Sequence, residues 1–429
     1  MNKGIDVRHW FLVLVFPLIA AAASDVSGEW ELTGSVLGST VYGHLNLKEA
    51  GGKITGDFEG LTIQGTLNAD RLDFTATRPN GESFGKFQAK LQSGGELSGT
   101  AEWSDNRHVT WSARRPVKPS SQAQIHDFVP KEFHRLFADS IPPVLRIYPG
   151  DTVRTTTVDA GGVDSQGVHR SQGGNPETGP FYVEGAFPGD TLSVKLNKVE
   201  LNRDSAESGD QIVGSALDSR YVHDAKYNEK YDSTWILDTK NGVARLKNPS
   251  EHLKNYTVKL RPMLGCIAVA PPAHQAYRTG FLGSFGGNMD YNQLGEGVTL
   301  YLPVFAPGAL LFLGDGHAAQ GDGELTGDAL ETSMRVEFTV GLIKGQSIPY
   351  PRAENDEYLM SFGIGNSLPE ALQIATTQLV KWLQKDYKLD PNEAAIVLGS
   401  AMQYNIAEVV DPLVHVVAKV RKESISALK

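Results

Sequence analysis

The sequence predicts a mainly β protein of the β-rich α+β class, with two domains and helices near the C-terminus. Three observations support this. Short runs of alternating apolar and polar residues follow one another near the N-terminus, the pattern stays mostly β from His126 onward, and helical spacing is confined to the last part of the chain. Strands followed by segregated helices favour an α+β arrangement over a doubly wound sheet.

The first residues have the layout of an export signal. A basic start precedes the apolar run 10–19, which leads into alanines at 20–23. This order predicts a cleavable signal peptide over 1–23, with the mature chain beginning near Ser24 or Asp25. The run is shorter than the roughly 20 residues that span a bilayer. No Arg-Arg pair precedes it, so we expect Sec-type export to a periplasmic or secreted location, without stable membrane insertion. An uncleaved N-terminal anchor is the alternative.

Residues 24–115 are expected to form a small all-β domain. Eight short alternating runs are separated by turn signals rich in Gly, Asn and Asp. Eight strands at this spacing predict a meander that closes into a small barrel or forms a sandwich. Trp30, Trp103 and Trp111 either fill its core or line a ligand pocket, and core packing is the more common role in barrels of this size. Since no titratable cluster occurs here, we expect an accessory domain.

A polar, proline-bearing linker over 116–125 is predicted to lead into a second domain over 126–429. Residues 369–387 carry apolar side chains at helical spacing, which predicts a helix with one buried face. The sequence Asp-Pro-Asn-Glu at 390–393 then predicts the N-cap, first-turn proline and capping acid of a second helix that ends at about Met402.

Composition and charge limit the possible partners. The chain has 429 residues, 40% of them hydrophobic, and a formal net charge of -10. Such values are typical of globular proteins, and the negative charge argues against nucleic acid or anionic membranes as partners. Cys266 is the only cysteine, so no intramolecular disulfide can form. Its apolar neighbours predict a small buried residue rather than a nucleophile.

The segment 314–324 is the most informative part of the chain. It places three carboxylates, one imidazole and one amide among four glycines, directly after the apolar run 310–313 that is predicted to be a buried strand. If the strand stays extended through Asp315 and His317, their side chains share one face and can converge on one cation or one water. The alternative is a tight turn with solvated carboxylates.

A second loop offers similar groups. The sequence Gly-Gly-Asn-Met-Asp at 286–290 places the amide of Asn288 two residues before the carboxylate of Asp290, beside two glycines. It comes just before a predicted strand over 297–303. Two such loops joined by one short β segment can face a common cleft, and this lowers the odds that either loop is only a turn.

These motifs resemble the acetamidase/formamidase family, and the resemblance covers residues 126–429. The similar segments are 142–145, 149–153, 175–186, 188–192, 286–290, 300–305, 307–310, 317–324, 371–383 and 409–412. It implies a β-sandwich core with helices near the C-terminus, and an amidohydrolase that releases ammonia from a short neutral amide. Residues 211–253 match no motif of the family, so a lactam or another small cyclic amide stays open as the substrate.

The resemblance also points to two further residues. Asp159, in the sequence Val-Asp-Ala-Gly-Gly at 158–162, matches an aspartate that the family places before a small-residue turn, which makes it a candidate metal ligand. A solvated turn carboxylate is the alternative. His134 falls where the family tends to carry a histidine and is a candidate for substrate binding, for a second-line metal ligand or for an acid. A surface or capping histidine is the alternative.

Amide hydrolysis requires an activated water, a polarised carbonyl and a proton for the leaving amine. A divalent metal can provide the first two. Asp and His ligands around an open position suit zinc, whereas an all-oxygen set suits calcium or magnesium. We therefore expect a divalent metal, zinc with calcium as the alternative, and the expected ligands are His317, Asp290, Asp159 and Asp315.

No serine or cysteine nucleophile competes with this interpretation. Residues 283–286 lack the Gly-x-Ser-x-Gly spacing. Glu324 is expected to be the general base, Gln320 to hydrogen-bond the substrate, and Asp322 to be a third catalytic residue. The expected substrate-binding residues are Asn288, Gly287 and His134.

A binding protein is the alternative from another functional class. In that hypothesis the protein is a non-catalytic envelope component, whose β domain recognises a ligand and whose amidase-like domain is a scaffold. The intact set of carboxylates and His317 argues against a decayed site. We expect a small amide as the binding partner and a homo-oligomer, a dimer, as the assembly.

Overall fold

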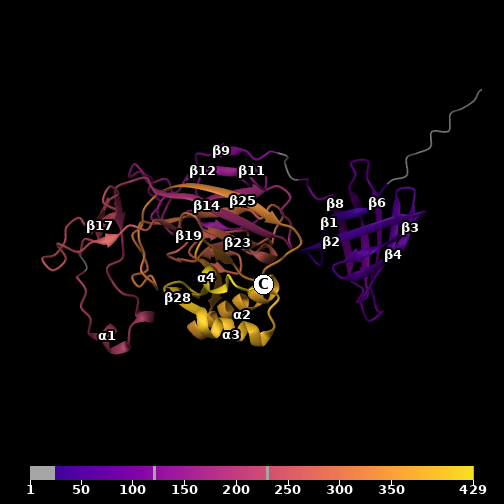
Figure 1. Ribbon diagram of the computed structural model, residues 1–429. Coiled ribbons are helices and arrows are strands. Elements are labelled where there is room, and N and C mark those ends of the chain that lie inside the picture. The colour runs from indigo at the N-terminus through magenta and orange to yellow at the C-terminus, as the bar shows by residue number, and fades with distance from the viewer. Residues whose placement is uncertain (1–24, 119–121, 229–230, 429) are drawn as a thin grey trace, which may run out of the picture. The chain divides into compact units, whose positions relative to one another are not determined.

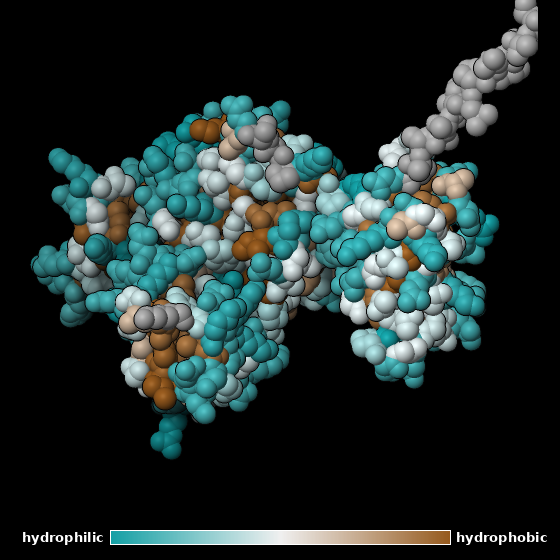
Figure 2. All heavy atoms as spheres, turned by 45° about the vertical axis from the view of Figure 1, so that its right-hand side comes forward, coloured by the Kyte–Doolittle hydropathy of each residue, from teal (hydrophilic) through white to brown (hydrophobic). Residues whose placement is uncertain are grey.

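The computed structural model describes residues 25–118, 122–228 and 231–428 (Figure 1). The chain divides into two compact units between Arg115 and Pro116. The expected signal peptide over 1–23 lies outside the described residues. Among the helices of the described ranges, none has the length and apolar character to cross a membrane. Figure 2 shows a largely hydrophilic surface on which hydrophobic atoms form separate patches.

The first unit is a closed barrel, which decides between the barrel and sandwich alternatives. Each strand pairs antiparallel with the next, and β8 pairs with β1. At Gly65 and Gly99 a Cβ would lie 2.1 and 1.8 Å from a carbonyl oxygen of the neighbouring strand, so glycine permits the close approach of the strands there. The strands are β1 (Gly28–Val36), β2 (Ser39–Ala50), β3 (Lys53–Phe58), β4 (Leu61–Asn68), β5 (Arg71–Thr77), β6 (Ser83–Leu91), β7 (Leu97–Trp103) and β8 (His108–Arg114).

Within its described residues, the second unit contains two main sheets and two small ones. The nine-stranded sheet has the order β28 (Met402–Glu408), β29 (Val414–Arg421), β27 (Tyr358–Gly365), β26 (Arg352–Glu354), β23 (Thr299–Pro303), β14 (Thr191–Leu201), β25 (Met334–Ile343), β12 (Thr152–Thr156) and β9 (Ile125–Asp127). The six-stranded sheet has the order β11 (Leu145–Ile147), β13 (Thr178–Val183), β24 (Leu311–His317), β19 (Met263–Ala268), β22 (Gly286–Asn288) and β21 (Leu282–Gly283).

The small sheets and short helices occupy the remaining segments. The four-stranded sheet contains β15 (Ser205–Glu207), β16 (Thr234–Asp238), β17 (Val243–Leu246) and β18 (Val258–Lys259), and the two-stranded sheet contains β10 (Leu136–Phe137) and β20 (Tyr277–Arg278). The short helices are η1 (Gly214–Ala216), α1 (Ser219–Asp224) and η2 (Pro272–His274).

The two main sheets share one hydrophobic core. Phe181 of β13 and Phe338 of β25 meet edge to face, with ring centroids 5.3 Å apart. Cys266 in β19 is fully buried in the same core, as expected from its apolar neighbours. The six-stranded sheet also carries the candidate site, because β19 pairs antiparallel with both β22 and β24 and thereby brings the two polar loops together.

The C-terminal helices cover the nine-stranded sheet beside β27 and β29 (Figure 1). Helix α2 (Leu368–Tyr387) buries Ala371 and Ala375, and a Cβ at Gly363 of β27 would lie 1.9 Å from the Ala371 carbonyl oxygen. Helix α3 (Pro391–Ala401) begins with the expected capping box. It ends at Ala401, in agreement with the expected end at about Met402, which caps the helix and begins β28. Helix α4 (Lys422–Ile425) follows β29.

Candidate active site

Five acidic and imidazole side chains converge in the six-stranded sheet and the loop that follows it. Asp290 follows β22, Asp315 and His317 belong to β24, and Glu324 and Glu331 lie in the next loop. All five are at most 7% exposed. The His317 Nε2 atom lies 3.0 Å from Glu331 Oε1, 3.5 Å from Asp315 Oδ1, and 4.0 Å from both Asp290 Oδ1 and Glu324 Oε1. The structure thus unites the two polar loops that the sequence singled out.

The backbone of three cluster residues has an uncommon conformation. Asp290, Asp315 and Glu324 have φ angles of 40°, 52° and 46°, in the left-handed region that residues other than glycine rarely adopt. Strand β24 therefore does reach His317, but it is not regularly extended at Asp315. Strained backbone of this kind is most common at functional sites, where it directs a side chain toward a required position.

Gly265 of β19 forms the base of the cluster. A Cβ at this position would lie 2.3 Å from Asp290 Oδ1, 2.5 Å from Asp315 Oδ2 and 3.0 Å from His317 Cε1. Any side chain here would occupy the space among the acidic groups. Glycine at 265 therefore leaves room for the polar atoms to gather around a shared centre.

The charges of this cluster are not balanced by the described residues. Four carboxylates surround a single imidazole, and five buried atoms have no hydrogen-bond partner in the described part of the chain: Asp290 Oδ1, Asp315 Oδ1, His317 Nε2, Glu324 Oε2 and Glu331 Oε2. A buried charge without a partner is costly. Two sets of potential ligand atoms lie within 4.8 Å of one another, Asp290–His317–Glu324 and Asp315–His317–Glu331. This donor set fits one or two divalent cations, which would balance the charge.

The pKa values reflect the same imbalance. Burial and the neighbouring carboxylates raise the pKa values of Asp290 and Glu324 well above their usual range, and burial raises the pKa of Glu331 to about 7. Burial alone would lower the pKa of His317, but Glu331 and Asp315 raise it well above its usual range. The low polarity and the crowding of like charges are the physical causes.

Gln320 orients the imidazole. Its Oε1 atom lies 2.9 Å from His317 Nδ1, and its Nε2 atom donates to the backbone oxygens of Asp290 and Ala407. Since the amide oxygen can only accept, Nδ1 carries a proton, and in the singly protonated imidazole the lone pair of Nε2 faces the carboxylates. We expected Gln320 to bind the substrate, whereas here its amide contacts protein groups at both ends and positions His317.

Asn288 has a similar role for two carboxylates. Its Nδ2 atom donates to Asp290 Oδ2 at 2.6 Å and to Asp411 Oδ2 at 2.9 Å, and its Oδ1 atom accepts from Asn175 Nδ2 at 2.8 Å. Asn175 also donates to Asp315 Oδ2 at 3.3 Å. The Asn288 amide, expected to bind substrate, is therefore engaged with protein groups. It holds Asp290 and Asp411 in place, and Asn175 holds Asp315.

Other candidate residues lie outside the cluster. Asp159, expected to be a metal ligand, forms an ion pair with Arg203 at 2.6 Å and accepts from the Val163 N–H. Its charge is therefore already neutralised. Asp322, expected to be catalytic, is exposed and accepts from the side-chain amides of Asn292 and Asn405.

The two remaining candidates also contact protein rather than the cluster. His134 pairs through its backbone with Glu177, and its ring lies edge-on to Phe312. Burial beside the core lowers the pKa of His134. Gly287 has a φ of 106°, and a Cβ there would lie 2.2 Å from the Phe281 carbonyl oxygen. Its role is therefore to let two backbone segments approach closely.

Sequence reasoning missed several residues of the site: Glu331, Asn175, Asp411 and the fully buried Glu177. Asn175 and Glu177 lie in a segment that resembles the family, which was the available signal for them. Glu331 reaches the cluster because its backbone forms isolated bridges with His317 and Glu207, and no local motif marks it.

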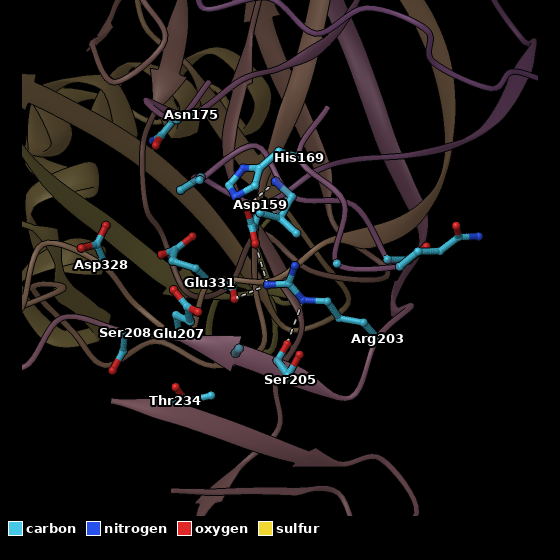
Figure 3. A pocket seen from close by; sticks show the side chains of 18 of the residues that line it. Asp159, His169, Asn175, Arg203, Ser205, Glu207, Ser208, Thr234, Asp328 and Glu331 are labelled. Carbon is cyan, nitrogen blue, oxygen red and sulfur yellow. Dashed lines mark hydrogen bonds and ion pairs between the residues drawn. The ribbon is translucent and has the colours of Figure 1, made fainter. Parts of the chain in front are cut away.

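A polar cavity of about 900 Å³ borders the cluster (Figure 3). Asn175 and Glu331 line it, and both also contact the cluster. The ion pair between Asp159 and Arg203 forms another part of the lining, with His169 nearby (Figure 3). Cavities of this size hold small-molecule ligands, so a small molecule in it could reach the cluster at Glu331.

Comparison with known proteins identifies the family. Residues 269–411 match the acetamidase/formamidase family. An acetamidase from Yersinia enterocolitica is 30% identical, with 72% of this chain and 93% of that chain aligned and a TM-score of 0.58. An acetamidase from Bacillus halodurans is 25% identical over 70% of this chain and 99% of that one, with a TM-score of 0.59.

A formamidase from Methylophilus methylotrophus is 25% identical over 273 residues, which cover 50% of this chain and 64% of that protein, less than two thirds of its length. The chain belongs to the acetamidase/formamidase family. The family and the fold class expected from the sequence are both confirmed, including the additional N-terminal barrel.

Proposed function

We propose that the protein is an amidase that hydrolyses a short neutral amide to a carboxylate and ammonia, with a divalent cation held by the buried cluster around His317. One observation carries this proposal. Four carboxylates and one imidazole meet in the protein interior, their inward atoms lack partners among the described residues, and the cluster borders a cavity of about 900 Å³. The names of the formamidase and acetamidase relatives support amide substrates.

The residues divide into ligands, positioning groups and a base. Asp290, Glu324, Asp315 and His317 would hold the cation, which when bound supplies activation of water and polarisation of the carbonyl. Gln320 keeps the proton of His317 on Nδ1, so Nε2 is available as a ligand atom. A ligand set that includes an imidazole favours zinc over calcium, which prefers oxygen ligands alone.

Glu331 is better placed than Glu324 to be the base. Glu331 lines the large cavity, whereas Glu324 lies beside Gln320 at a separate pocket of about 200 Å³. We therefore assign Glu331 the role of accepting the proton of the attacking water and returning it to the leaving amine. Glu324, expected to be the base, joins the ligand set in this proposal.

Metal content and ammonia release together test the proposal. The full-length protein, loaded with zinc, should hold stoichiometric metal and release ammonia from formamide, acetamide or propionamide, and small lactams test the cyclic alternative. Asp322→Asn is the matched control, because this exposed residue lies in the same loop and outside the cluster; it should keep both properties. If the protein holds stoichiometric zinc but hydrolyses none of these amides, the proposed activity is wrong. If hydrolysis persists in fully metal-free protein, the proposed role of the metal is wrong.

A further inference from the structure

The N-terminal barrel contains a cavity that the amidase proposal does not use. It has a volume of about 480 Å³ and is lined mainly by apolar and aromatic side chains. The interiors of eight-stranded barrels are just wide enough either to be filled by side chains or to hold one small ligand. A volume of this size is in the range of ligand sites rather than of packing defects.

The cavity opens at one end of the barrel. Every second turn of an up-and-down barrel lies at the same end, and the lining residues cluster around the turns β1–β2, β3–β4, β5–β6 and β7–β8. Figure 2 shows hydrophobic atoms exposed among hydrophilic ones on this unit. The main apolar lining residues are Val41, Phe58, Leu61, Phe84, Phe87 and Trp103.

The opposite end is closed by side chains. Leu47, Ile54, Leu72 and Leu97, next to the turns β2–β3, β4–β5 and β6–β7, are at most 1% exposed. Trp30 belongs to this end, with its indole N–H donating to the Val26 carbonyl. One end of the barrel is therefore a packed core, whereas the other end is hollow.

Two indole groups at the hollow end have no acceptor. The Nε1 atoms of Trp103 and Trp111 are buried and have no hydrogen-bond partner among the residues that the structure describes. Trp111 is only 4% exposed and lies opposite Gly34 of β1 and Gly99 of β7. An unsatisfied buried donor is costly, so a ligand that supplies an acceptor would recover this cost.

The charges at the opening favour an electron-rich acceptor. Arg78 lines the cavity, with its guanidinium carbon 5.2 Å from the Phe84 ring centroid. It donates to the Ser83 carbonyl, and within the described ranges it forms no ion pair with a carboxylate. Glu59 also lines the opening, but it is hydrogen-bonded to His44.

We propose that this barrel end binds a small, planar, largely apolar molecule that carries one hydrogen-bond acceptor, such as a carbonyl or carboxylate. The rings of Phe84, Phe87 and Trp111 contact its flat surface, and the indole N–H groups of Trp103 and Trp111 donate to its acceptor. This binding is independent of the amidase site, which lies in the other unit.

Two isosteric probes test the proposal on the full-length protein. 2-Acetylnaphthalene carries a carbonyl, and 2-isopropenylnaphthalene has the same shape without an acceptor. Calorimetry or tryptophan quenching should show that the ketone binds more tightly, by about two- to tenfold for each hydrogen bond to its carbonyl. The double variant W103F/W111F retains the rings and loses both donors, so it should bind the two probes equally.

Two further variants separate binding from folding. W30F removes an indole N–H from the closed end and should keep the preference for the ketone. L61W places a larger side chain at a half-buried position of the opening. It should weaken the binding of both probes tenfold or more, while the circular dichroism spectrum and the rate of amide hydrolysis stay unchanged. The proposal is overturned if the wild type binds neither probe, if it shows no preference for the ketone, or if the preference survives in W103F/W111F.

Discussion

The imidazole of His317 presents its Nδ1 atom to Gln320 Oε1 at 2.9 Å, while its Nε2 atom faces four buried carboxylates. The Gln320 amide is itself fixed by the backbone oxygens of Asp290 and Ala407. The tautomer and the orientation of His317 are therefore set outside the cluster. In metal sites, such partners commonly determine how well a histidine serves as a ligand.

Replacing Gln320 by methionine should weaken metal binding without abolishing it. Methionine has a similar length but lacks the amide acceptor, so His317 loses the group that fixes its tautomer. We expect the dissociation constant for zinc to rise about ten- to hundredfold, as measured by competition with a chelator. Asp322→Asn in the same loop is the control. An unchanged dissociation constant in Gln320→Met would show that the contact with Nδ1 does not prepare His317 for a metal.

The sequence predicted those features that are encoded locally. Alternating residues and turn glycines predicted the eight strands of the barrel, because side chains in a strand alternate between two faces. The loop around His317 was recognised because polar residues among glycines directly follow an apolar strand. The loop around Asp290 was recognised because an amide and a carboxylate lie two residues apart beside glycines, just before a predicted strand. Their convergence was also expected, but the structure brings them together through β19, which pairs with both β22 and β24, and not through the short β segment between them.

The parts of the site that were missed depend on contacts between distant segments. Asp159 was expected to be a ligand, but Arg203 pairs with it in three dimensions and neutralises it. Glu331 joins the cluster through backbone bridges, including one with Glu207, that no local pattern reveals. The amides of Gln320 and Asn288 were recognised as site groups, but whether they face substrate or protein depends on partners far away in the sequence.

Gly265→Ala should remove metal binding and activity while the fold is retained. The new Cβ would lie 2.3 Å from Asp290 Oδ1 and 2.5 Å from Asp315 Oδ2, and both side chains would have to move. Gly280→Ala is the matched control, because nothing lies within 4 Å of a Cβ at that position. We expect at least a hundredfold loss of ammonia release for Gly265→Ala and wild-type values for Gly280→Ala. If the Gly265→Ala enzyme is fully active, the reaction does not take place at the cluster around His317.

Removal of residues 24–115 should preserve amide hydrolysis. The barrel is a separate compact unit and contributes no residue to the cluster around His317. The rate of the truncated enzyme should stay within about a hundredfold of that of the full chain, which corresponds to about 3 kcal/mol of transition-state stabilisation. A greater loss in a folded truncated protein would mean that the barrel contributes to catalysis.

His415 should make the protein less stable at acidic pH. It is fully buried, its Nδ1 atom hydrogen-bonds the Met289 carbonyl, and burial lowers its pKa to about 4. The unfolded chain, with a histidine pKa of about 6.5, binds the proton more readily. The contribution of the neutral His415 ring to the free energy of unfolding is therefore fully present above pH 6.5 and is lost as the pH falls toward 4.

The substitution His415→Gln isolates this contribution, because glutamine does not titrate and can still donate to the Met289 carbonyl. Between pH 7 and pH 4, the free energy of unfolding of the wild type should fall by on the order of 3 kcal/mol more than that of the variant. Urea unfolding at several pH values measures the difference. If the free energies of unfolding of the two proteins change in parallel with pH, His415 is not the source of the acid sensitivity.

Ligand and base variants should separate in two measurements. Removal of a ligand leaves the cation under-coordinated, whereas removal of the base leaves the cation bound and the water without a proton acceptor. His317→Ala, Asp290→Ala and Glu324→Gln should therefore lose both zinc and activity.

Glu331→Gln should keep stoichiometric zinc and lose about a hundredfold or more in turnover, the scale of general acid–base participation. The argument depends on position, because Glu331 borders the large cavity and lies 3.0 Å from His317 Nε2, whereas Glu324 borders a different pocket. If Glu324→Gln keeps zinc and loses turnover while Glu331→Gln loses zinc, the two glutamates exchange roles. If His317→Ala keeps its zinc and most of its activity, the cluster is structural and the proposed mechanism is wrong.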